Sequence, residues 1–200
     1  MDLAYPFRGR WLVGNSPADR VPSHGTTAFA SSYAIDFVPV DHRGRTAPIR
    51  LRTLVGSEAP QRFPGFGRPV LAPAAGLVIA ASDEDTDHDA YRGLPSIGYA
   101  LTQGRRADAG WPALAGNHVL IRTPTGPVVA LCHLQQASLR VQEGQQVRVG
   151  QPIAGCGSTG NSTEPHLHVQ VIDRPDPERA EPVPLSFDGA VPRSGRIVQA

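Results

Sequence analysis

The sequence predicts an all-β protein whose short strands form an antiparallel sheet or sandwich. Runs rich in Val, Ile and Leu alternate with Gly, Pro and Asn, which is typical of strands separated by turns. No segment keeps a long helical period. The 21 Gly and 20 Pro are spread along the whole chain, which favours many short elements over a few long ones. At 200 residues the chain is long enough for one domain with a hydrophobic core.

The expected strands are 32–38, 50–55, 69–72, 76–81, 118–122, 128–133, 151–155 and 166–172. Helical turns are expected only near 134–138 and in the middle of the chain. We interpret residues 1–200 as a single domain with a core of about 21–172 and a loop-rich insertion of about 83–115. The Pro-rich tail, 173–200, is expected to be extended and to lie on the surface.

The insertion begins with an acidic cluster at residues 83–89. Calcium could bind to Asp85, Asp87, His88 and Asp89, but the Gly and the distal Glu of an EF-hand loop are absent. A solvated acidic loop on the surface is the favoured interpretation.

Composition excludes several functions. A net charge of +1 gives no basic footprint for nucleic acid or for a membrane surface. All nineteen basic residues are Arg, so Lys-dependent chemistry such as a Schiff base or a biotinyl or lipoyl attachment is excluded. No apolar run approaches the roughly 20 residues of a membrane span, and the first residues do not read as a signal peptide.

The two cysteines, Cys132 and Cys156, are expected to be buried free thiols, since a pair in strand-like runs makes no disulfide framework. Cys132 adjoins His133. If both lie on one strand, their side chains face opposite ways, which predicts that Cys132 points away from a site containing His133.

Several polar residues stand at strand positions. His166 and His168 are two residues apart, so a strand would project both imidazoles to one face, where they could bind zinc or carry protons. His133 ends another expected strand and could also be an ordinary structural histidine. Asp36 stands between Ile35 and Phe37, where burial alone would be costly and a metal or cation would offset the cost. Hydrogen bonds to loop amides, or a solvated strand face, are the alternatives for Asp36.

Taken together, these residues resemble a known family. The order His24, Asp36, His133-Leu134-Gln135 and Pro165-His166-Leu167-His168 is similar to that of the lysostaphin-type (LytM-like) zinc metalloendopeptidases. Three framing segments, 67–78, 116–121 and 141–154, resemble strands and a hairpin of the same family, and the resemblance covers roughly 21–172. Eleven residues separate His24 from Asp36, more than in most members.

The resemblance implies a β-fold of the duplicated hybrid motif type and a catalytic Zn²⁺ held by His24, Asp36 and His168. It places His133 and His166 beside the metal as catalytic residues, without assigning which is the general base. The implied substrates are peptidoglycan cross-links or other peptides rich in small residues, and the implied location is extracytoplasmic. Glu164 is a candidate to orient a ligand histidine, with an ordinary loop residue as the alternative.

Two further functions remain open at this point. One is an inactive relative that binds cell-wall material or regulates another hydrolase, although such relatives typically lose ligands and all five polar positions are present here. The other is a zinc hydrolase that acts on a different peptide inside the cell. The segment 143–154 resembles the hairpin of carrier domains, but the missing acceptor Lys excludes attachment.

Overall fold

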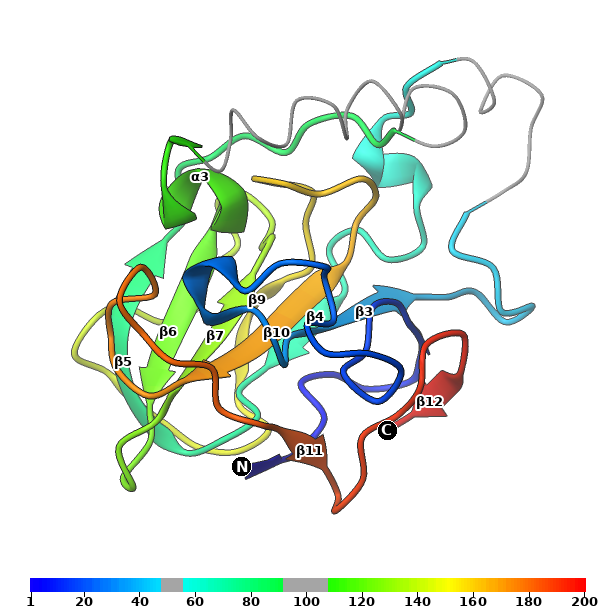
Figure 1. The fold of residues 1–200 in the computed structure, drawn as a ribbon. Coiled ribbons are helices and arrows are strands. Elements are labelled where there is room, and N and C mark those ends of the chain that lie inside the picture. Colours follow the sequence, from blue (N-terminus) through cyan, green and yellow to red (C-terminus); the bar gives the residue numbers. More distant parts are fainter. Residues whose placement is uncertain (48–55, 92–107) are drawn as a thin grey trace.

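An antiparallel sheet of eight strands organises the fold, in the order β12-β2-β3-β10-β7-β6-β5-β8 (Figure 1). The structure is a computed structural model that describes residues 1–47, 56–91 and 108–200. The strands of this sheet are β2 (Arg10–Val13), β3 (Ile35–Pro39), β5 (Gly76–Ser82), β6 (His118–Arg122), β7 (Val128–Cys132), β8 (Gln146–Val147), β10 (Leu167–Ile172) and β12 (Ile197–Gln199).

Two small sheets complete the fold. They are formed by β4 (Pro69–Leu71) with β9 (Pro152–Gly155), and by β1 (Asp2–Leu3) with β11 (Ser186–Phe187). The helices whose bounds fall within the described residues are short: η1 (Ala28–Ala30), η3 (Pro60–Arg62) and α3 (Trp111–Ala115). None of the described helices is long and apolar enough to cross a membrane.

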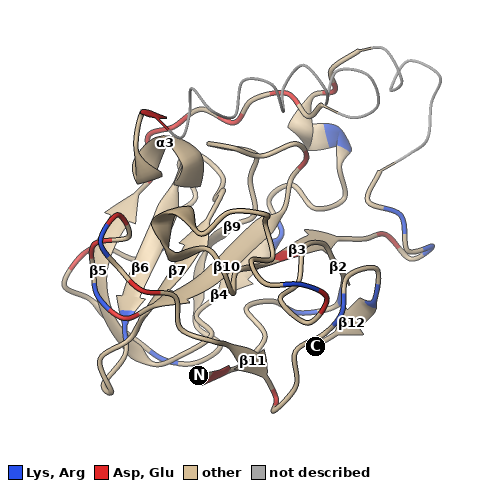
Figure 2. Cartoon of the chain, viewed as in Figure 1, with Lys and Arg blue, Asp and Glu red and all other residues tan. Residues whose placement is uncertain are grey.

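The central strand β10 has two different faces. Its alternate residues Leu167, Val169 and Val171 are buried in the main hydrophobic core. Because side chains alternate along a strand, His168 and Gln170 project to the opposite face. Figure 2 shows β7 and β10 without Asp, Glu, Lys or Arg, so the carboxylate of Asp36 on neighbouring β3 meets histidines rather than Lys or Arg here.

The all-β prediction is confirmed, and the expected strands that fall on described residues are present with ends shifted by a few residues. The expected strand 50–55 lies outside the described residues. Residues 134–138 form a turn rather than a helix, whereas the middle of the chain does contain a helix, α3.

The prediction of a tail confined to the surface is wrong. Strand β11 pairs with β1, β12 extends the large sheet by pairing with β2, and Phe187 is only 1% exposed. Strands of two or three residues carry too little periodicity to be read from sequence, and these form because distant segments supply their hydrogen-bonding partners.

The solvated interpretation of the acidic cluster is also wrong for part of it. The carboxylate of Asp83 accepts hydrogen bonds from the amides of Ser138 and Leu139, and Asp87 likewise binds main-chain amides. Main-chain amides therefore satisfy these carboxylates. Residues 92–107 of the expected insertion lie outside the described part of the chain.

Candidate metal centre

Three side chains from distant parts of the sequence meet above the central strands. Ligand atoms of His24, Asp36 and His168 all lie within 4.8 Å of one another. His24 Nε2 is 2.9 Å from Asp36 Oδ2, and His168 Nδ1 is 3.0 Å from Asp36 Oδ1. Two imidazoles and a carboxylate are a donor set that zinc prefers, and three protein ligands leave a position for water or substrate. The residues present therefore fit a catalytic zinc ion.

Strand register brings two of these residues together. Asp36 on β3 is directly opposite His168 on β10, and facing residues of antiparallel strands project to the same side of the sheet. His24 arrives from a loop that closes on itself, because the amide of Ser23 donates to the carbonyl of Ser32. The long gap between His24 and Asp36 is thus a closed loop.

That loop also forms a wall of the site. Phe29 and Ala30 have φ angles of 55° and 56°, in the left-handed region that costs non-glycine residues about 1–2 kcal/mol each. The carbonyl of Phe29 accepts a hydrogen bond of 3.0 Å from Gln170 Nε2. A buried side chain of β10 therefore helps to hold the strained turn in place.

Each candidate ligand has an orienting partner that sequence reasoning missed. Asn15 Nδ2 donates to Asp36 Oδ2 (2.9 Å), and the Ser23 hydroxyl, which donates to the carbonyl of Ala34, can accept the Nδ1–H of His24 (2.9 Å). Gln170 Oε1 is 3.0 Å from His168 Nε2. Such partners fix the ring tautomer and leave the other nitrogen for the metal. A sequence signal exists for Gln170, which alternates with His168 on one strand face, but not for the two loop residues.

The ionisation of Asp36 and the ionisation of His24 depend on each other. Burial opposes ionisation of Asp36, but the charge of His24 and hydrogen bonds from His168 and His24 hold the pKa of the Asp36 carboxyl well below its usual value. Burial also disfavours a charged His24, yet the Asp36 carboxylate raises the pKa of His24. A proton and a metal ion therefore compete for His24.

His133 and His166 reach the same cavity with their Nε2 atoms. The Nδ1 of His133 is 2.9 Å from the carbonyl oxygen of Thr159, and the Nδ1 of His166 is 2.9 Å from that of Glu164. A carbonyl can only accept, so both rings donate Nδ1–H and leave Nε2 facing the site. The main chain of Glu164 thus orients His166, which is not one of the three candidate ligands. The ring centroids of the two histidines are 4.5 Å apart.

His133 does not continue the strand, contrary to expectation. Strand β7 ends at Cys132, and His133 has a φ of 63°, which turns its ring toward the site. Burial, and then the neighbouring histidines, hold the pKa of His133 well below its usual value, so this ring is neutral at neutral pH.

The predicted orientation of Cys132 is wrong for the same reason. Cys132 is directly opposite His168 in the sheet and lines the same cavity as His133. The expectation of opposite faces failed because it extended the strand by one residue. Burial raises the pKa of the Cys132 thiol, which stays protonated, and both cysteines are buried and free as expected.

These residues line a cavity of about 400 Å³ that opens to solvent. Its walls combine apolar and polar side chains: Thr26 and Phe29 from the loop before β3, Trp111 and Leu114 from α3, and Asn161 and Thr163 from the loop before β10. The described lining brings together all five residues singled out from the sequence. A segment of a substrate could lie in this cavity against walls that are largely uncharged.

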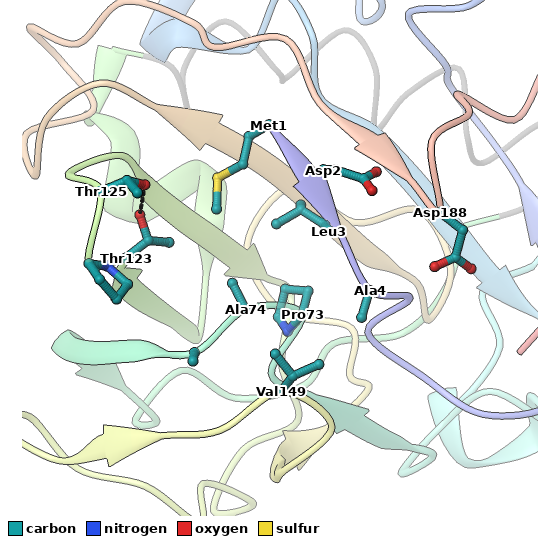
Figure 3. Close-up of a pocket in the computed structure, with 12 residues that line it drawn as sticks. Met1, Asp2, Leu3, Ala4, Pro73, Ala74, Thr123, Thr125, Val149 and Asp188 are labelled. Atoms are coloured by element: carbon teal, nitrogen blue, oxygen red, sulfur yellow. Dashed lines mark hydrogen bonds between the residues drawn. The ribbon is translucent and has the colours of Figure 1, made fainter.

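A second hollow lies beside the N-terminal strand β1 (Figure 3). Its acidic groups are Asp2 and Asp188, and the Asp2 carboxylate already accepts hydrogen bonds from Ser186 and Gly189. No histidine or cysteine is among its described lining residues. Among these two cavities, the candidate metal-binding and catalytic side chains therefore line the first.

Gln170→Met should weaken zinc binding by about 10–100-fold, because His168 loses the acceptor that fixes its tautomer. Competition with a chromogenic chelator would measure the affinity. Gln170→Glu is the matched control: it still presents an oxygen to His168 Nε2 and should bind zinc more tightly than Gln170→Met. Equal affinity in wild type and Gln170→Met would contradict an orienting role.

Comparison with known families agrees with this geometry. Residues 90–182 match the model of Peptidase family M23. The match includes His133, His166 and His168, whereas His24 and Asp36 precede it.

Individual relatives are similar over part of the chain. Glycyl-glycine endopeptidase ALE-1 of Staphylococcus capitis is 34% identical over 71 residues, which are 36% of this chain and 20% of the relative. Peptidoglycan DD-endopeptidase ShyA of Vibrio cholerae is 35% identical over 79 residues, or 40% of this chain and 18% of the relative. The chain thus spans about a fifth of the length of these two curated relatives.

Among solved structures, the catalytic domain of the antimicrobial peptidase lysostaphin from Staphylococcus simulans aligns over 88% of both chains. The sequence identity is 18% and the TM-score is 0.44.

Proposed function

We propose that this protein is a zinc-dependent endopeptidase that hydrolyses peptide bonds in peptidoglycan cross-links. The observation that carries the proposal is the His24, Asp36 and His168 cluster, which opens into a cavity that two further histidines, His133 and His166, also line. The similarity of residues 90–182 to a peptidase family supports peptide-bond hydrolysis. The presence of all three candidate ligands argues against an inactive binding module.

In this proposal His24 Nε2, one or both oxygens of Asp36, and His168 Nδ1 hold the zinc ion. A zinc ion bound there would polarise the scissile carbonyl and lower the pKa of a water molecule to about 7. Asn15, Ser23 and Gln170 keep the three ligand atoms aimed at a common point.

His133 is the proposed general base. Its Nε2 is unprotonated at neutral pH and takes a proton from the attacking water, while the water oxygen bonds to the carbonyl carbon. The same proton then passes to the leaving nitrogen as the C–N bond breaks. His166 Nε2 lies 3.9 Å from Asp36 Oδ1, and His166 is the proposed partner of the substrate carbonyl oxygen.

The substrate proposal rests on the relatives. ALE-1 is named a glycyl-glycine endopeptidase and ShyA a peptidoglycan DD-endopeptidase, so peptides of the cell wall with small residues at the cut site are the class to test. Action on such a substrate also implies an extracytoplasmic location. The uncharged side chains of Phe29 and Leu114 line the cavity, and such a surface suits an extended peptide with few large side chains.

Digestion of purified cross-linked peptidoglycan tests the proposal. The zinc-loaded protein should release peptide fragments with new amino termini, identified by mass spectrometry. Dipicolinate treatment should abolish release, and added zinc should restore it. Intact cross-links after incubation with zinc-loaded protein, together with cleavage of an unrelated small-residue peptide, would point to a different peptide substrate.

A further inference from the structure

The acidic segment 83–91 runs alongside two loops that together set the position of His133. The first loop, 133–139, begins with His133 itself. The second, 157–163, contains Thr159, whose carbonyl oxygen is 2.9 Å from His133 Nδ1. The spacing of the two loops therefore determines whether the Nδ1–H of His133 finds its acceptor.

One carboxylate bridges these loops. Asp87 Oδ1 accepts a hydrogen bond of 2.6 Å from the amide of Ser158, next to Thr159. Asp87 Oδ2 accepts one of 3.0 Å from the amide of Gln136, three residues after His133. Bonds from amides to an ionised carboxylate are shorter and stronger than bonds between neutral groups. Asp87 thus binds one loop with each oxygen.

Packing at the bridge leaves little freedom. A Cβ atom on Gly157 would lie 2.6 Å from Asp87 Oδ1 and 2.4 Å from the backbone nitrogen of Gln135. Only glycine fits at this point, so the carboxylate and both loops are in direct contact. The amide of Gly157 also donates to the carbonyl of His133, at 2.9 Å.

The neighbours of Asp87 reinforce the same contact. The amide of His88 donates to the carbonyl of Ser158, at 3.0 Å. Asn117, fully buried, donates from Nδ2 to the carbonyls of both Asp85 and Leu134. Burial raises the pKa of Asp87, against the effect of the two amides, so the carboxylate is held in a partly desolvated place.

We propose that Asp87 is a positioning residue for His133: it holds the two loops at the separation at which Thr159 accepts Nδ1–H and Nε2 faces the cavity. The inference rests on the proposed endopeptidase function for its effect on rate, but its effect on the His133 ring is independent of that function. It gives the acidic segment a role that neither calcium binding nor solvation supplies.

The test compares Asp87→Asn with Asp85→Asn. Both remove one negative charge from the same segment, but the Asp85 carboxylate is exposed, so only Asp87→Asn should affect the bridge. An amide at position 87 directs its NH₂ group at one of the two backbone N–H groups and keeps at most one bond. For Asp87→Asn we expect kcat to fall about 10–100-fold, KM to change by less than about twofold, and bound zinc to stay equal to wild type.

A spectroscopic readout separates this inference from the proposed function. In the zinc-loaded wild type, the buried Nδ1–H of His133 should give a slowly exchanging proton resonance, assigned by its absence in His133→Gln. Asp87→Asn should shift that resonance or speed its exchange, and Asp85→Asn should leave it unchanged. If wild type does not hydrolyse peptidoglycan, the proposed function fails while this readout still tests the bridge.

Asp87→Glu covers the case in which Asp87→Asn does not fold. It keeps the charge and both oxygens on a longer arm, and should lower kcat in the same direction with zinc retained. A variant at position 87 with wild-type kcat and an unchanged His133 resonance would overturn the proposal. Lowered thermal stability alone, with kcat unchanged, would also overturn it, because Asp87 would then be merely structural.

Discussion

His168→Ala is expected to lose both bound zinc and peptide hydrolysis. The substitution removes one of the three proposed ligands, whose Nδ1 is 3.0 Å from Asp36 Oδ1. The remaining pair, His24 and Asp36, would leave the ion without a complete set of protein ligands. Since a zinc ion supplies several kcal/mol of transition-state stabilisation, kcat/KM should fall by about 10³-fold or more.

Elemental analysis of the purified protein measures the first half of this expectation. Wild type should contain one zinc per chain and His168→Ala close to none. His42→Ala is the matched control, because His42 is an exposed histidine outside the cavity and its removal should leave zinc content unchanged. Equal zinc in wild type and His168→Ala would contradict the ligand assignment.

His133→Gln is expected to retain zinc and to lose hydrolysis. His133 is not a proposed ligand, and its Nε2 faces the cavity as a base that burial keeps neutral. General-base catalysis contributes about 10²–10⁴-fold, and kcat should fall by that order. The folded-state pKa of His133 lies below its usual value. In wild type the His133 Nε2 should therefore stay unprotonated, and able to act as a base, as the pH falls below about 6.5.

Zinc content and kcat measured on the same preparation test this second expectation. Retained zinc with lost turnover supports a catalytic role for His133. Retained zinc with full turnover would make His133 structural and would leave His166 as the candidate base. Loss of zinc from His133→Gln would contradict the separation of ligands from catalytic neighbours.

The sequence was sufficient to predict the residues that converge at the site. The strand alternation and the ordered motifs pointed to His168 and Asp36, and the register of β10 against β3 then makes them face each other. The family resemblance supplied His24 across an unusual gap, and that gap is a loop closed between Ser23 and Ser32. Assignment of metal-binding and catalytic roles stays a prediction.

Other features depend on details that strand periodicity does not contain. One left-handed residue, His133, ends β7 early and reverses the expected relation between His133 and Cys132. The partners Asn15 and Ser23 act from irregular loops whose paths depend on the folded sheet. The acidic segment looked solvated because the amides that bind Asp87 come from Gln136 and Ser158, far away in the sequence.

Crystallography of the zinc-loaded protein at the zinc absorption edge tests the central claim most directly. The account predicts one anomalous peak in the main cavity, bonded to His24 Nε2, Asp36 and His168 Nδ1, with His133 and His166 adjacent but not bonded. A peak coordinated by His133 and His166 instead, or no peak at His24, Asp36 and His168 in zinc-saturated crystals, would contradict it.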